Sequence, residues 1–173
     1  SRIMAEILII AEIGQNHDGS IDKAKALIES AKECGANIAK FQVYDAQELF
    51  PKSNNPWYEY NCKTELSRED IITLSNHCKE VGIEFMASVF DTHRIVWLEE
   101  LDVKRYKIAS RSINDDELIM HMEQTGKELI ASLGQWDWRN NAFPKIKNCD
   151  FLYCVSKYPT RLEELKLMSV DFK

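Results

Sequence analysis

Two lysines stand inside segments whose composition is otherwise that of buried β-strands. Lys40 lies in the apolar segment 37–43, and Lys107 lies in the segment 105–109. The two-residue period of a strand places Lys40 and Gln42 on one face. A buried ammonium group is costly unless an anion pairs with it. Each lysine therefore either pairs with a neighbouring carboxylate such as Glu12, or binds a phosphate or carboxylate of a small substrate.

Further polar side chains stand at the ends of the other apolar segments. Glu12 is near the end of the first one, and the remaining ones are Ser110, Ser132, Ser156 and Tyr158. In parallel α/β proteins, functional groups gather at the carboxyl ends of the strands. Two lysines and serine hydroxyls at that edge predict an anion site. For Glu12, general acid–base catalysis and a structural ion pair both remain open.

Histidine and cysteine spacing predicts no metal site built by this chain alone. No two of the four histidines have metal-ligand spacing, and the five cysteines contain no C-x-x-C pair. A dispersed, odd set of cysteines predicts free thiols in a reducing cytoplasm, most of them buried as small apolar groups.

The elements that must position these groups alternate regularly along the chain. Residues 45–66 form the one long irregular stretch, and its length and aromatic content predict a functional loop packed on the protein. Ser20 and Ser67 are expected helix N-caps, with Gly35 and Gly82 as stops. The expected strands are 7–13, 37–44, 84–89, 105–110, 128–133 and 151–156, and the expected helices are 21–34, 68–81, 93–101, 113–125, 162–168 and a weaker 139–147.

This alternation predicts right-handed βαβ units and a parallel sheet, either open and doubly wound or closed as a (β/α)8 barrel. No G-x-G-x-x-G follows the first strand, which argues against a dinucleotide-binding fold. The net charge of −6 with no basic block argues against nucleic acid or an anionic membrane as partner. The apolar runs are far shorter than the ~20 residues of a membrane span, and no signal peptide is visible, which favours the cytoplasm.

The order of several short motifs resembles that of the bacterial N-acetylneuraminate synthase family, which includes the legionaminic and pseudaminic acid synthases. The motifs are AEIGQNHDG at 11–19, KFQ at 40–42, SVFD at 88–91, YKIAS at 106–110, SLG at 132–134 and CVSKYP at 154–159. The resemblance implies an α/β fold, a (β/α)8 TIM barrel that is incomplete here. Residues 1–173 would form about the first six βα units, with strands 7–8 and the C-terminal antifreeze-like domain absent.

The resemblance also implies an activity and roles for single residues. The family condenses phosphoenolpyruvate with an N-acetylated hexose such as N-acetylmannosamine, with a divalent cation, usually Mn²⁺, as Lewis acid. It forms a nonulosonic acid, releases phosphate and acts as a homo-oligomer. Lys40 and Lys107 would bind the anionic groups and Glu12 would act near the reacting carbons. The remaining substrate-binding positions are Gln42, Ser110, Ser132, Ser156 and Tyr158.

Departures from the family pattern keep alternatives open. Ser156 stands where Asn is common, and Arg111 and Ser112 replace Gly-Glu, which bears on the sugar acceptor. The family's metal-binding histidines lie in strands 7 and 8, so the ligands of the metal are not expected in this chain. One alternative is an inactive or truncated remnant that keeps an anion-binding half-pocket or assembles with another chain. A related barrel that makes a seven- or eight-carbon keto acid is another.

Overall fold

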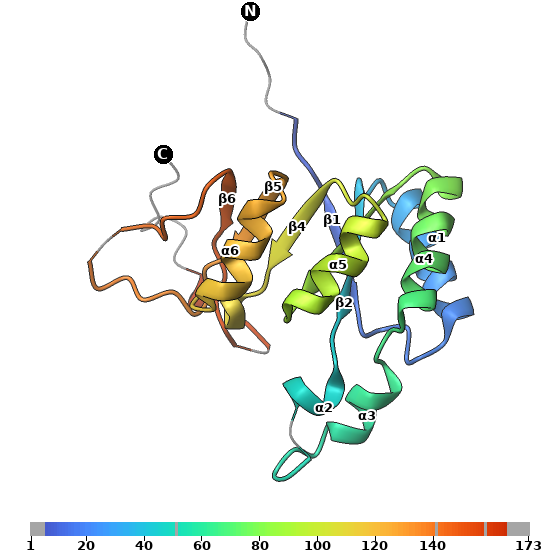
Figure 1. The fold of residues 1–173 in the computed structure, drawn as a ribbon, viewed down its shortest axis with the longest axis horizontal. Coiled ribbons are helices and arrows are strands. Elements are labelled where there is room, and N and C mark those ends of the chain that lie inside the picture. Colours follow the sequence, from blue (N-terminus) through green and yellow to red (C-terminus); the bar gives the residue numbers. More distant parts are fainter. Residues whose placement is uncertain (1–5, 51, 141, 158, 166–173) are drawn as a thin grey trace, which may run out of the picture. The chain divides into compact units, whose positions relative to one another are not determined.

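The chain folds into two compact units, Ser1–Lys104 and Arg105–Lys173. The structure is a computed structural model that describes residues 6–50, 52–140, 142–157 and 159–165. Each unit is built from parallel strands, and helices connect the consecutive strands except the last two of the second unit (Figure 1). The predicted alternation of strands and helices is confirmed in the first unit and up to the fifth strand in the second.

The first unit contains three parallel strands in the order β1-β2-β3. A β-bulge interrupts the register of β1 between Glu12 and Gly14. Helices α1 and α4 lie side by side along these strands (Figure 1). The elements are β1 (Ile10–Gly14), α1 (Ile21–Glu33), β2 (Ile38–Val43), α2 (Ala46–Leu49), α3 (Tyr58–Lys63), α4 (Arg68–Val81), β3 (Glu84–Val89) and α5 (Thr92–Glu100).

The long helices begin where the predicted caps stand. The Ser20 side chain accepts a hydrogen bond from the Lys23 N–H, and Ser67 forms a reciprocal capping box with Asp70. Gly82 ends α4 with a left-handed φ of 86°, which a residue with a Cβ rarely adopts. The apolar faces of α1 and α4 are buried, and Lys40 is one of several polar or charged residues buried in this unit.

Residues 45–66 are less irregular than their sequence predicts, because α2 and α3 lie within them. Their packing on the protein is confirmed. The Gln15 side-chain amide donates to Tyr44 Oη at 2.8 Å, Asn61 Oδ1 at 2.9 Å and Thr64 Oγ1 at 3.1 Å. The Tyr60 hydroxyl donates to the Gln15 carbonyl at 3.0 Å. These bonds attach the segment to the residues that follow β1.

The second unit contains three further parallel strands in the order β4-β5-β6. Its elements are β4 (Arg105–Ile108), the 3₁₀ turn η1 (Ser110–Ser112), α6 (Asp116–Gln124), β5 (Glu128–Ser132), β6 (Cys149–Leu152) and the 3₁₀ turn η2 (Leu162–Glu164). The sixth strand begins two residues earlier than predicted and ends at Leu152. The helix expected at 162–168 is a 3₁₀ turn over its described part.

The prediction of a helix at 139–147 is wrong, because the described residues between β5 and β6 form turns. Pro144 disfavours a continuous helix there. The Trp136 indole N–H donates to the Ala142 carbonyl at 2.8 Å, which closes a compact turn. Phe143 packs against Trp138 and against Phe151 of β6, with ring centroids 5.1 and 5.4 Å apart. These aromatic contacts, rather than a helix, pack this segment against β6.

All five cysteines are free, as predicted, but their expected burial is wrong for most of them. Only Cys78 is buried, whereas Cys34 and Cys62 are exposed. Among the described residues, none of the helices has the length and apolar character needed to cross a membrane.

Candidate anion-binding site

Glu12 and Lys40 form an ion pair across two neighbouring strands of the first unit. They are directly opposite in the β1–β2 register, and Lys40 Nζ lies 2.6 Å from Glu12 Oε2. The lysine side chain is 7% exposed, whereas the glutamate side chain is 57% exposed. A buried ammonium is therefore balanced by a carboxylate that reaches solvent. Of the two interpretations of Lys40, the structure therefore shows the ion pair with Glu12.

The same face of the sheet carries two more polar side chains. In the β2–β3 register, Gln42 lies opposite Ser88, so both project from the same face as Lys40. Ser88 is 1% exposed, and its Oγ has no hydrogen-bond partner among the described residues. A buried hydroxyl without a partner costs free energy. Ser88 is therefore an additional candidate for contact with a ligand.

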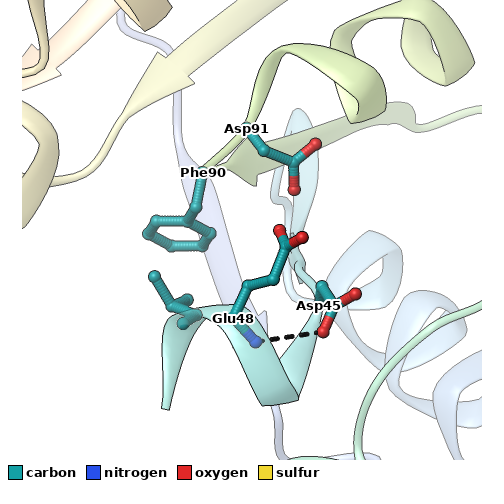
Figure 2. Close-up of a pocket in the computed structure, with 5 residues that line it drawn as sticks. Asp45, Glu48, Phe90 and Asp91 are labelled. Carbon is teal, nitrogen blue, oxygen red and sulfur yellow. Dashed lines mark hydrogen bonds between the residues drawn. The ribbon is translucent and has the colours of Figure 1, made fainter. Parts of the chain in front are cut away.

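Beyond the ends of β2 and β3, the first unit has a small pocket of about 90 Å³ (Figure 2). It is lined by Asp45, Glu48, Leu49, Phe90 and Asp91. Figure 2 shows the Glu48 carboxyl group directed toward that of Asp91. Asp45 caps α2 and Asp91 caps α5, where the helix N-termini favour negative charge. Three carboxylates disfavour an anion in this pocket, so it is distinct from the anion-binding groups.

In the second unit, Lys107 is held among hydrogen-bond acceptors at the ends of the strands. It is 3% exposed, and its Nζ donates to Ser132 Oγ at 2.6 Å and to the Ile108 carbonyl at 3.0 Å. The structure therefore brings together a lysine and a serine that the sequence assigned to one site.

The backbone of Gly134, two residues after Ser132, lies close to the side chains of three other residues. A Cβ at Gly134 would clash with Ser156 Oγ and would lie 3.0 Å from Ser110 Oγ and 3.6 Å from the Cys154 Cβ. The two hydroxyls therefore approach the backbone where only glycine fits. Ser110 and Ser156 come from the segments that follow β4 and β6. Hydroxyl groups from two strand ends thus meet over one glycine.

The pKa of the Cys154 thiol indicates which charge the groups around it favour. Burial, the largest single influence, raises the pKa of the thiol, whereas hydrogen bonds from the Ser132 and Ser110 hydroxyls lower it. The backbone N–H groups of Leu133 and Gly134 lower the same pKa. The net pKa is below the ordinary value for a thiol. The donors around Cys154 therefore favour negative charge, as a phosphate-binding group must.

The predicted site residues are thus found in two groups, one in each unit. Glu12, Lys40 and Gln42 share a face in the first, and the second holds Lys107, Ser110, Ser132 and Ser156. Tyr158 lies outside the described residues. Three residues of these groups were not selected from the sequence, namely Ser88, Gly134 and Cys154. The two-residue period of the strand indicates Ser88, because it lies two residues after Met86, which is opposite Lys40 in the register.

A divalent cation does not fit the described residues. Among them, no group of three or more histidine, cysteine, aspartate or glutamate side chains is placed to hold a metal ion. We therefore assign no step of the chemistry to a metal held by these residues.

Parallel βα units with polar groups at the strand ends fit both predicted architectures, and a likeness to a solved structure assigns this chain to the (β/α) barrel class. The structure superposes on that of an N-acetylneuraminic acid synthetase from Leptospira borgpetersenii, determined in complex with citrate, with a TM-score of 0.83 and 27% identity. The match covers 92% of this chain and 58% of that one. The predicted fold, the N-terminal portion of a TIM barrel, is confirmed.

The chain belongs to the NeuB family, whose family model matches residues 27–172. It is 34% identical to the N-acetylneuraminate-9-phosphate synthase of Mus musculus over 181 residues, covering 94% of this chain and 50% of the relative. It is 35% identical to the N,N'-diacetyllegionaminic acid synthase of Legionella pneumophila over 187 residues, covering 94% and 52%. The chain thus spans about half the length of the curated relatives it matches.

Proposed function

We propose that this chain is the part of a nonulosonic acid synthase that binds phosphoenolpyruvate. In the proposed reaction, phosphoenolpyruvate condenses with an N-acetylated hexose, such as N-acetylmannosamine, and phosphate is released. The observation that carries the proposal is the set of donors at the strand ends of the second unit. There, a buried lysine, serine hydroxyls and backbone N–H groups favour negative charge at one place.

The family resemblance assigns the two anionic groups of phosphoenolpyruvate to Lys107 and Lys40. In this proposal Lys107, with the Ser110 and Ser132 hydroxyls, binds the phosphate, because hydrogen bonds from a charged donor to an anion are strong. Lys40 takes the second anionic group. Gln42 and Ser156 contribute amide and hydroxyl contacts, and Tyr158 remains assigned to the pocket by family resemblance alone.

The proposed chemistry forms one carbon–carbon bond and breaks one carbon–oxygen bond. Phosphoenolpyruvate C3 attacks the aldehyde carbon of the sugar, and the aldehyde oxygen gains a proton. Water adds to C2 and loses a proton. The C2–O bond to phosphate then breaks as the new C2 hydroxyl gives its proton to the leaving phosphate, which leaves a ketone. Glu12 is suited to orient that water or accept its proton, because its carboxylate is more than half exposed while it pairs with Lys40. The family resemblance implies a divalent cation, proposed as Mn²⁺, which would supply Lewis-acid chemistry from ligands other than the described residues.

Several expectations about the whole protein stay proposals. These are homo-oligomer formation, a cytoplasmic location and the identity of the sugar acceptor. The sugar and phosphoenolpyruvate remain the proposed partners. Binding of an anion without any turnover would favour the alternative of a remnant that keeps only part of the pocket.

The experiment is a comparison of two lysine substitutions by isothermal titration with phosphoenolpyruvate and with inorganic phosphate. Lys107→Met keeps the volume of the buried side chain and removes its charge. Loss of one charged hydrogen bond of about 1.5–3 kcal/mol predicts roughly 10- to 150-fold weaker binding. Lys104→Met removes the same charge from an exposed position and is the matched control. Equal affinity in the two variants would contradict the assignment of Lys107.

A further inference from the structure

His17 is completely buried in the turn that joins β1 to α1. It is 0% exposed, and its ring lies 6.3 Å from that of Phe41, centroid to centroid. The Gly19 backbone N–H donates to His17 Nδ1 at 3.0 Å. His17 Nε2 is buried without a hydrogen-bond partner among the described residues. The turn therefore encloses a titratable side chain that has one satisfied nitrogen.

The hydrogen bond from Gly19 defines the protonation state that fits the turn. Nδ1 accepts this bond, so it carries no proton, and the neutral ring has its proton on Nε2. A second proton would have to enter at Nδ1, where it would face the Gly19 N–H. Protonation would also place a positive charge in a site without solvent. The closed turn therefore discriminates strongly against imidazolium.

The turn contacts α1 and α3 through hydrogen bonds and one close backbone approach, all of which depend on its conformation. The Ser20 N–H donates to the His17 carbonyl at 2.9 Å, and this bond precedes the first residue of α1. A Cβ at Gly19 would clash with the Lys63 carbonyl of α3. The Tyr60 hydroxyl of α3 donates to the Gln15 carbonyl and to Asp18 Oδ1, both at 3.0 Å. The residues on both sides of His17 therefore contact α3 directly.

Charged groups around His17 act in both directions, but burial dominates. Burial lowers the pKa of His17 below its ordinary value of 6.5. Asp18 of the turn and Asp70 of α4 raise this pKa, and Lys23 of α1 lowers it. Phe41 of β2 presents an apolar ring, and α3 presents the Lys63 carbonyl near Gly19. The net effect favours the neutral ring.

We propose that His17 is a proton-operated latch: the neutral ring holds the β1–α1 turn closed against α3, and protonation opens the turn. Because the open turn binds the proton more tightly, the latch is fully effective above pH 6.5. Its contribution is lost as the pH falls from 6.5 toward the lower pKa of the closed state. This inference does not depend on the identity of the substrate.

The experiment measures amide hydrogen exchange of residues 15–20 between pH 7.5 and 5, corrected for the intrinsic pH dependence of exchange. Below pH 6.5 the opening constant should rise by about tenfold for each pH unit, until the closed-state pKa is reached. His17→Asn is the informative variant, because its Oδ1 can accept the Gly19 N–H and does not titrate in this range. Exchange in this variant should not depend on pH after correction.

His121→Asn provides the matched control. His121 contacts the Glu117 carbonyl at 2.8 Å on α6, in the second unit, and its loss should leave the pH dependence of residues 15–20 unchanged. If His17→Asn fails to fold, titration of the wild-type His17 ring and Gly19 amide by NMR decides the question. A His17 pKa at or above 6.5, or acid-induced opening that persists in His17→Asn, would overturn the proposal.

Discussion

Gly134→Ala should separate anion binding from folding in the second unit. The added Cβ would clash with Ser156 Oγ and lie 3.0 Å from Ser110 Oγ, closer than an ordinary van der Waals contact. At least one hydroxyl must turn away, and a lost hydrogen bond to an anion costs about 1.5–3 kcal/mol. We therefore expect phosphate and phosphoenolpyruvate to bind roughly 10- to 150-fold more weakly. Gly134 does not have a left-handed φ, so the melting temperature should change little.

Gly126→Ala is the matched control for this substitution and should give the opposite result. Gly126 has a φ of 72°, and nothing lies within 4 Å of a Cβ added there. Forcing alanine into this conformation costs about 1–2 kcal/mol, so stability should fall while anion binding persists. Isothermal titration and thermal unfolding of both variants test the pattern. Unchanged affinity in folded Gly134→Ala would refute the role of this glycine and its serines in binding an anion.

Three further predictions concern the ion pair, the thiols and the Gln15 network. Glu12→Ala should lower the free energy of unfolding by about 1–3 kcal/mol because it leaves buried Lys40 without its carboxylate, whereas Lys40→Met should be nearly neutral in urea unfolding. The pKa of Cys154 is lowered, whereas burial raises that of Cys149 to about 12, so Cys154 should react faster with iodoacetamide at pH 7–8. Phosphate should slow the reaction of Cys154, and equal rates for the two thiols would contradict the prediction. Tyr44→Phe removes a buried hydroxyl bonded to Gln15 and should cost about 1–3 kcal/mol in the same urea experiment, and an unchanged midpoint would be inconsistent with that bond.

The sequence predicts well those elements whose ends carry a local chemical signal. Helices α1 and α4 have serine caps, and α4 ends at a glycine, so their bounds differ from expectation by at most one residue. The segment between β5 and β6 has no such signal. Its apolar residues suggested a weak helix, but Pro144 and contacts of Phe143 with distant residues determine its path. Short helices such as α2 and α3 also escape detection, because four to six residues are too few to show a period.

The candidate site was predictable to the extent that strand period fixes which way a side chain points. Period two placed Lys40 and Gln42 together, and strand ends indicated Lys107 with Ser132. The role of Gly134 is not predictable from the sequence, because it depends on the lack of a Cβ at that position. The closeness of two hydroxyls to its backbone depends on how β4, β5 and β6 are packed, which no local pattern encodes.

The unequal burial of Glu12 and Lys40 connects the two interpretations of this lysine. An ammonium that is 7% exposed requires an anion, which is why the loss of Glu12 is expected to cost about 1–3 kcal/mol. A carboxylate that is 57% exposed can return to water at little cost. A substrate anion that binds Lys40 can therefore replace Glu12, since the buried charge remains paired throughout. The displaced carboxylate is then free to orient water or accept a proton beside the bound substrate. Pairing with Glu12 and binding of an anion are thus two states of one lysine in the proposed function.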